Sequence, residues 1–244
     1  MIASLPMYET APMRAANDRW WTAIQTTFGL GPQFLDRESD PHETWVDPDL
    51  LLSQTCGLPY RTTLRDVVQL VGTPDYAVEG CPPGYYRSNL IVRANDPRQA
   101  LTDFNGSTLA RNDPRSQSGW AAVETHLRTV HAGFSFASQV IDTGSHLNSL
   151  RAVCSGQADI AGIDAVTWSL LMRDTQDTQG LRVLASTAPT PGLPLITGAT
   201  QDPAALLRAV RLALAELSDE DRKCLMLHDV VSIPRAAYCA VPDA

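Results

Sequence analysis

The chain has 244 residues, of which 44% are hydrophobic and 19% charged, so it can bury the core of one large domain or two small ones. Its 19 Lys and Arg stand against 27 Asp and Glu. The net charge of −8 argues against nucleic-acid binding through the overall field, and no apolar run approaches the length of a membrane span.

Strands and helices are predicted to alternate along the chain, a pattern typical of α/β architecture with largely parallel sheets. We expect strands at residues 2–8, 34–35, 50–55, 67–72, 85–93, 108–111, 140–142, 160–163, 181–186 and 193–197. We expect helices at residues 12–28, 119–130, 145–155 and 166–172, one after the Asp202 cap and a last one opened by Ser218. Residues 36–49 are polar and proline-bearing, so we interpret them as a loop.

The turn after the strand 108–111 gathers small polar residues at residues 112–120, just before a helix. Backbone N–H groups and hydroxyls at a helix N-terminus suit a tetrahedral oxyanion, and Gly119 permits close approach of the backbone. The alternative is that Ser118 simply caps the helix, because Ser is a preferred cap.

Two further turns place polar residues after strands. Ser145 is expected to cap a helix whose first turn holds His146, which can donate a hydrogen bond when neutral and attract an anion when protonated. The alternative is a surface histidine near a helix end. Asp164 ends the strand 160–163 and either faces a protonated or amine-bearing ligand or caps the next helix.

Enzyme motifs are absent from the sequence. We find no phosphate-binding GxxxxGK[ST] loop, no GxGxxG, no HExxH and no GxSxG. We therefore predict no catalytic residue, no cofactor and no enzymatic activity, although a triad recognised only by geometry stays an open alternative.

Five cysteines form no CxxC pair, and metal-ligand spacing is lacking, so we predict no metal site. Cys56 ends a strand and Cys81 lies in a loop before the strand 85–93. These two either form a disulfide or remain reduced thiols, and the outcome depends on the redox state of the compartment.

Six segments, taken in order, resemble the phosphate/phosphite/phosphonate-type substrate-binding proteins of ABC transporters, which have the type II periplasmic binding protein fold. They are residues 3–8, 54–60, 86–92, 112–119, 144–146 and 156–164. The resemblance covers nearly the whole chain.

The resemblance implies a two-lobed α/β clamp in which each lobe is a mostly parallel sheet flanked by helices. Lobe 1 would comprise residues 1–88 and 186–244, and lobe 2 residues 89–185. Hinge crossovers would lie near residues 86–92 and 181–187, with the ligand in the cleft between the lobes.

The resemblance also implies a set of ligand-binding residues. Ser116, Gln117 and Ser118 would hold the oxyanion, with His146 nearby and Asp164 facing the ligand. Gln117 stands where phosphonate binders tend to carry a small hydroxyl residue. The complete predicted set is Tyr8, Tyr60, Ser88, Ser116, Gln117, Ser118, Gly119, Ser145, His146 and Asp164.

The function that we expect is therefore capture of a small phosphonate- or phosphate-like anion for ABC-type import, with an ABC permease as partner. A cytoplasmic ligand sensor on the same fold is the main alternative, and an enzyme that took over the cleft is the third. The chain does not open with a basic segment and a long apolar stretch. We accordingly expect a periplasmic protein if a leader has been removed, and a cytoplasmic one otherwise.

Overall fold

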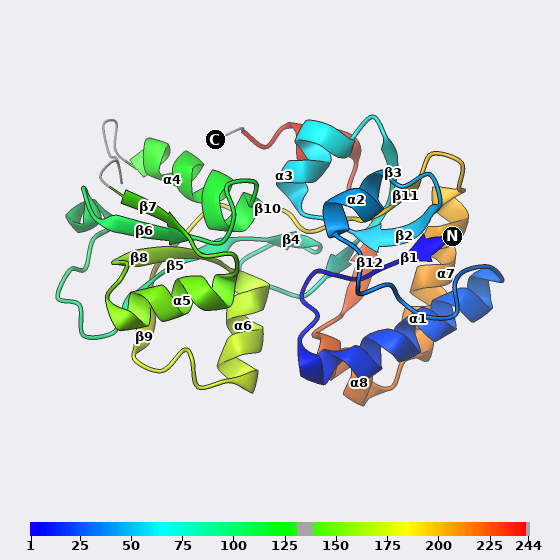
Figure 1. The fold of residues 1–244 in the computed structure, drawn as a ribbon, viewed down its shortest axis with the longest axis horizontal. Coiled ribbons are helices and arrows are strands. Elements are labelled where there is room, and N and C mark those ends of the chain that lie inside the picture. The colour runs from blue at the N-terminus through cyan, green and yellow to red at the C-terminus, as the bar shows by residue number, and fades with distance from the viewer. Residues whose placement is uncertain (131–138, 243–244) are drawn as a thin grey trace. The chain divides into compact units, whose positions relative to one another are not determined.

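The computed structural model describes residues 1–130 and 139–242 and divides the chain into two compact units (Figure 1). Met1–Tyr85 and Pro191–Ala240 form the first unit, and Tyr86–Thr190 form the second. Residues 241 and 242 group with the second unit, although the sequence-based boundaries place them in the first. At the two crossings, β4 (Tyr85–Tyr86) and β10 (Thr190–Pro191) pair as a two-stranded sheet.

The first unit holds a five-stranded sheet in the order β1-β2-β11-β3-β12. Its strands are β1 (Ile2–Ala3), β2 (Leu50–Gln54), β3 (Val68–Asp75), β11 (Leu195–Gly198) and β12 (Asp229–Val231). Its helices are η1 (Ala11–Met13), α1 (Arg14–Phe28), α2 (Pro41–Val46), α3 (Gly57–Pro59), η2 (Tyr60–Leu64), α7 (Pro203–Glu216), α8 (Asp219–Leu225) and α9 (Arg235–Cys239).

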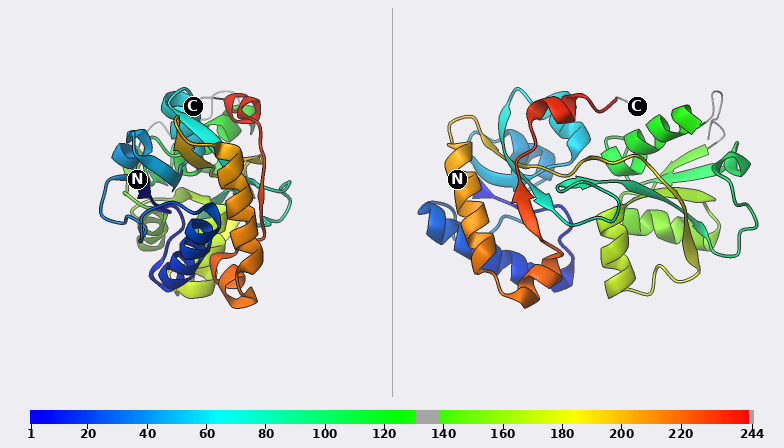
Figure 2. Two further views of the ribbon diagram at one scale, coloured as in Figure 1. Left: turned by 90° about the vertical axis from the view of Figure 1, so that its right-hand side faces the viewer. Right: turned by 180° about the vertical axis from the view of Figure 1, so that it is seen from behind.

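Side-chain alternation along these strands gives the first sheet two apolar faces. On one face a core cluster joins α2, η2 and α9 to the strands: Trp45, Leu50, Tyr60, Leu64, Val68, Ile196, Ile233 and Tyr238. Leu51 points to the opposite face, where it borders Trp21 of α1 at Gly31. Helices α1 and α7 lie side by side in the views of Figures 1 and 2.

The second unit is also a five-stranded sheet, in the order β7-β6-β8-β5-β9. Its strands are β5 (Ser88–Arg93), β6 (Thr108–Arg111), β7 (Gln139–Asp142), β8 (Ile160–Asp164) and β9 (Leu181–Ser186). Its helices are η3 (Leu101–Phe104), η4 (Gln117–Ala121), α4 (Ala122–Val130), α5 (His146–Ser155) and α6 (Ala165–Asp174).

Consecutive residues of the second sheet enter different cores. Leu90, Leu109 and Ile160 pack with Val123 and Leu127 of α4. The next residue along each strand enters a second cluster instead. There Ile91, Ala110 and Ala161 pack with Leu150 and Val153 of α5 and with Leu171 of α6. The period of two in the strands therefore buries both faces, as expected for a sheet covered by helices on each side.

The strand pairing is mixed rather than mostly parallel in both units. Among the described strands, β1–β2, β6–β7 and β6–β8 are parallel pairs, whereas β11 and β5 run antiparallel to both of their neighbours. The apolar run of each strand predicts burial on both faces, but it carries no information about the direction of its neighbour.

Four local predictions differ from the structure. The strand expected at 2–8 is only β1, and the residues expected as a strand at 34–35 are not in one. The expected loop 36–49 contains α2, because Asp40 caps it by accepting hydrogen bonds from the backbone N–H groups of His42 (2.7 Å) and Glu43 (3.4 Å), with Pro41 at the first helical position. The single strand expected at 85–93 is interrupted between β4 and β5.

All five cysteines lie within the described residues and are thiols in the structure. The disulfide between Cys56 and Cys81, one of the two alternatives drawn from the sequence, is therefore absent from this structure.

Candidate functional site

The carboxyl ends of three parallel strands meet at one edge of the second sheet. Strands β7, β6 and β8 are neighbours with the same direction, and each is followed by a helix. Ser88 begins the antiparallel strand β5 at the same edge, where its register partner is Asp164 at the end of β8. This edge therefore collects all the site residues predicted in the second unit, as is common for ligand sites of open α/β sheets.

The polar turn after β6 leads into a helix that starts with a wide π-helical turn. Ser116 is the N-cap, and its Oγ accepts a hydrogen bond from the Gly119 N–H at 3.0 Å. The Ala121 N–H bonds the Ser116 carbonyl at 3.1 Å, a bond to the fifth residue back that opens the first turn. Ser116, Gln117 and Ser118 are all buried at this terminus, which carries the partial positive charge of the helix.

Ser118 and His146 join two of the predicted segments directly. The Ser118 Oγ lies 3.1 Å from His146 Nε2. His146 is the first residue of α5, and Ser145 caps that helix by accepting a hydrogen bond from the Asn148 N–H at 3.1 Å. Two loops that are separate in the sequence thus place a hydroxyl and an imidazole in contact.

Burial lowers the pKa of His146 to about 4, and the nearby Gly162 carbonyl offsets this shift only in part. Within the described residues, His146 Nδ1 has no hydrogen-bond partner of normal geometry. The imidazole is therefore neutral at pH 7. A charged histidine therefore does not attract an anion to this edge at pH 7, whereas the neutral donors and the helix terminus can.

Gly162 in the middle of β8 lets the site helix approach the sheet. A Cβ at this position would lie 2.5 Å from Val123 Cγ2 and 3.2 Å from the carbonyl oxygens of Ser118 and Gly119. Gly119 is similarly restricted, because a Cβ there would lie 1.8 Å from Asn112 Oδ1. Glycines on the strand and on the helix therefore set the position of the polar turn.

Ser88 and Asp164 both lie at this edge and are both buried. The Ser88 backbone N–H donates to Thr187 Oγ1 at 3.0 Å, and its own Oγ has no partner among the described residues. Asp164 Oδ1 accepts hydrogen bonds from the N–H groups of Val166 (2.7 Å) and Thr167 (3.1 Å). Asp164 thus caps α6, as one of the two sequence interpretations expected, and a ligand contact stays a prediction.

Asp164→Ala is expected to lower the free energy of unfolding by about 1 kcal/mol, because it removes the cap of α6. Asp164→Asn keeps an equally good cap and is expected to preserve stability. Urea denaturation of both variants checks this. Calorimetric titration of the Asn variant with anions then isolates any role of the carboxylate in binding, because its cap is intact.

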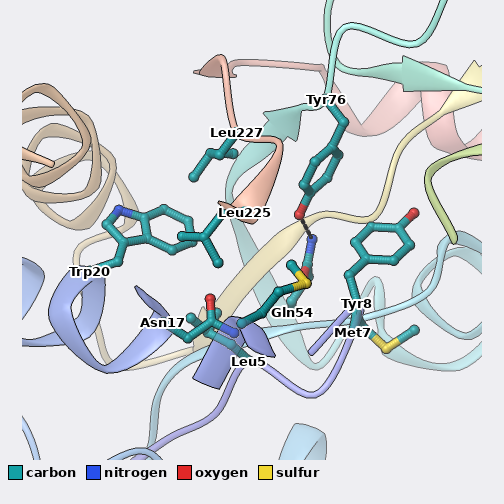
Figure 3. Close-up of a pocket in the computed structure, with 10 residues that line it drawn as sticks. Leu5, Met7, Tyr8, Asn17, Trp20, Gln54, Tyr76, Leu225 and Leu227 are labelled. Carbon is teal, nitrogen blue, oxygen red and sulfur yellow. Dashed lines mark hydrogen bonds between the residues drawn. The ribbon is translucent and has the colours of Figure 1, made fainter. Parts of the chain in front are cut away.

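In the first unit, Tyr8 adopts a left-handed backbone conformation with φ of 65°. Its ring meets that of Tyr76 edge to face, with centroids 5.0 Å apart. The Tyr76 hydroxyl accepts a hydrogen bond of 3.3 Å from Gln54 Nε2 (Figure 3). The residues predicted from the sequence include Tyr8 but not its neighbours Gln54 and Tyr76, although Gln54 ends β2 and Tyr76 follows β3.

Tyr60 occupies a different environment from the one predicted. Only 1% of it is exposed, and its ring packs edge to face on Tyr238 in the hydrophobic core, with centroids 5.1 Å apart. Burial raises the pKa of Tyr60 to about 12. Because its ring is part of the core cluster, we leave it out of the site. The short segment around it held no signal that separates a core tyrosine from a ligand contact.

A family model described as ABC transporter, phosphonate, periplasmic substrate-binding protein matches residues 56–233. The chain belongs to this family. The match begins just after β2, ends just after β12 and includes the whole polar edge of the second sheet. The phosphonate-binding family is one of transport proteins that bind solutes, not one of enzymes, and it is periplasmic.

Solved structures of low sequence identity share the fold of this family member. PhnD1 from Prochlorococcus marinus (MIT 9301), in complex with methylphosphonate, is 10% identical with a TM-score of 0.75 and covers 98% of this chain and 94% of its own. The binding protein component PA3383 of a phosphonate ABC transporter from Pseudomonas aeruginosa is 14% identical with a TM-score of 0.69, covering 96% and 81%. XAC2383 from Xanthomonas citri, bound to ATP, is 16% identical with a TM-score of 0.69, covering 97% and 94%.

These similarities confirm the two-lobed type II periplasmic binding protein fold expected from the sequence. None of the curated proteins matches the chain. No helix within the described ranges is both long enough and apolar enough to cross a membrane. Within the same ranges, no group of three or more His, Cys, Asp or Glu side chains is arranged to hold a metal ion.

Proposed function

We propose that this member of the phosphonate-binding family captures a small oxyanion, phosphonate- or phosphate-like, and delivers it to an ABC permease for import. The observation that carries the proposal is the Ser118–His146 contact at the start of the helix made of η4 and α4. It places a hydroxyl and a neutral imidazole at a helix terminus rich in N–H donors, which suits a negatively charged ligand.

The donors act together in the proposed complex. An oxyanion only accepts hydrogen bonds, so its binding selects the His146 tautomer that carries the proton on Nε2. That N–H donates to the Ser118 Oγ, and the Ser118 O–H is then available to the anion. The Ser116 Oγ already accepts from the Gly119 N–H, so its own hydroxyl proton is also available as a donor.

The remaining residues of the proposed ligand-binding set have supporting roles. Gln117 contributes a buried amide in the first turn, and Gly119 allows the backbone to approach the anion. Ser88 supplies a buried hydroxyl, while Ser145 and Asp164 hold the helices that follow β7 and β8.

The first unit contributes Tyr8 in this proposal. Its constrained backbone, with φ of 65°, and its contact with Tyr76 hold the ring in one place. Tyr8→Phe removes only the hydroxyl, so a loss of affinity in this variant assigns that hydroxyl to the ligand.

Ser118→Ala is expected to weaken binding of methylphosphonate and of inorganic phosphate by about tenfold or more. A hydrogen bond to a charged group contributes about 1.5–3 kcal/mol, and the variant also removes the partner of His146. Isothermal titration calorimetry at pH 7 measures the effect.

Ser155→Ala provides the matched control, because Ser155 is exposed at the opposite end of α5, where its Oγ donates to the Ala152 carbonyl. This control is expected to bind like the native protein. Native affinity in Ser118→Ala would remove the segment 116–119 from the site, and failure of the native protein to bind either anion would refute the proposed ligand class.

A further inference from the structure

Arg87 differs from the other arginines of the second unit in having no counter-charge. Residues 86–190 contain nine arginines and no lysine. Seven of the nine form ion pairs with Asp or Glu side chains. Arg182 donates to the backbone carbonyls of Asp96 and Arg98. Arg87 is partly buried, and no described residue accepts a hydrogen bond from its buried Nε or pairs with its charge.

The backbone places Arg87 at the polar edge of the second sheet. Arg87 directly precedes Ser88, and its carbonyl accepts the N–H of Ala165, the first residue of α6, at 3.0 Å. Side chains alternate along β5, where Ile91 packs with α5 and α6. By the same alternation, Arg87 belongs to the face of the sheet on which these two helices begin.

The known surroundings of Arg87 do not neutralise its charge. Helices α5 and α6 both begin at this edge, and a helix N-terminus carries a partial positive charge. Asp164 caps α6 through Oδ1 and forms no ion pair with Arg87. A partly buried cation is costly in free energy unless an anion pairs with it, so this part of the edge favours an anionic ligand.

The neighbouring residue supports the same kind of ligand. Ser88 is 1% exposed, and its Oγ has no partner among the described residues. A hydroxyl can donate to an oxyanion, whereas the Asp164 carboxylate at the same edge repels one. His146 is neutral at pH 7 and does not offset that repulsion. Arg87 has the charge to do so.

We propose that Arg87 is a further ligand-binding residue, whose guanidinium makes the site prefer a doubly charged oxyanion to a singly charged one. This inference rests on the oxyanion function proposed above. Coulomb attraction is proportional to the charge of the ligand, so Arg87 stabilises a bound dianion more than a bound monoanion. The guanidinium also presents two parallel N–H donors to two oxygens of one group, which the ammonium of Lys cannot do.

Methylphosphonate and dimethylphosphinate test the preference directly. Dimethylphosphinate has a methyl group in place of one oxygen, so it has a similar size and one negative charge less. Calorimetry at pH 8.5, where methylphosphonate is a dianion, measures both anions with the native protein, Arg87→Gln and Arg87→Lys. Arg128→Gln is the matched control, because it removes the same charge from an exposed arginine in the last turn of α4.

Arg87→Gln is expected to weaken binding of methylphosphonate about tenfold or more and binding of dimethylphosphinate only about threefold. The ratio of the two affinities therefore falls about threefold or more. Arg87→Lys keeps the charge, so it is expected to retain the preference for the dianion while binding it more weakly than the native protein does. Arg128→Gln is expected to bind both anions like the native protein.

NMR of the native protein adds a measurement that needs no substitution. The Arg87 Nε–H signal is expected to shift, and to exchange more slowly with solvent, when methylphosphonate binds. Native affinities in Arg87→Gln, an equal loss for both anions, or an unchanged Nε–H signal at saturation would each overturn the inference and leave the oxyanion function standing. Native protein that binds neither anion would refute the oxyanion function and this inference with it.

Discussion

Gly162→Ala is expected to lower the free energy of unfolding by about 1–3 kcal/mol and to weaken anion binding at least tenfold. The added methyl would lie 2.5 Å from Val123 Cγ2. Because Val123 is fully buried and branched at Cβ, a change of its χ1 rotamer to relieve this contact is energetically costly. The methyl would also press on the carbonyl oxygens of Ser118 and Gly119, both 3.2 Å away. The helix must then move off β8, and it takes the Ser118 hydroxyl with it.

A double-mutant cycle tests this steric explanation. Val123→Ala removes the methyl group that would collide, so the double variant is expected to recover part of the stability and affinity lost by Gly162→Ala alone. Gly106→Ala is the control, because it adds the same methyl group in open space at φ of 73°. It is expected to cost about 1–2 kcal/mol of stability for the left-handed backbone alone and to leave binding intact. Additive effects of Gly162→Ala and Val123→Ala would contradict the packing argument.

The second large effect is the pH dependence contributed by His146. Its pKa lies near 4 in the folded protein because of burial, below the ordinary value of 6.5. As the pH falls through 6.5, the unfolded chain takes up the proton and the folded chain does not, so the unfolded state is favoured. The contribution is complete above pH 6.5 and is lost progressively down to pH 4. A shift of about 2.5 units corresponds to at most about 3 kcal/mol of stability.

Comparison of variants isolates this contribution from the carboxylates that titrate in acid. Urea denaturation between pH 7 and 4 is expected to show a shallower loss of stability for His146→Asn than for the native protein. His228→Asn, which changes an exposed histidine, is expected to follow the native curve. NMR titration of the His146 ring gives the pKa directly, and a midpoint near 6.5 would refute a buried neutral imidazole.

Local features of the sequence predicted most of the helices and their ends. The Asp202 cap accepts from the N–H groups of Ala204 and Ala205, and Ser218 accepts from the Asp221 N–H, at the two helix starts that the sequence marked. Gly29 ends α1 in a left-handed conformation with φ of 83°. Each of these caps joins groups within about one helical turn of the chain, so the local sequence contains both interacting partners.

The candidate site was predicted in part for the same reason. Ser145 caps its helix as the sequence predicted, whereas the cap before η4 is Ser116 rather than Ser118, the alternative drawn from the sequence. The Ser118–His146 contact joins residues 28 positions apart, and only the parallel order of β6 and β7 brings their loops together. The π-helical turn at 117–121 likewise left no recognisable pattern in the sequence.

By itself, the sequence determined the α/β class, the turns that carry polar residues and the resemblance to the phosphonate-binding family, because propensity, periodicity and capping act over a few residues. Only the tertiary structure decided the mixed direction of the strands, the burial of Tyr60 against Tyr238, and the lowered pKa of His146. It also assembled a small pocket of the first unit (Figure 3) from residues that include Trp20 and Leu227, which lie far apart in the chain. Burial and desolvation depend on which distant segments pack together, and no local pattern specifies that packing.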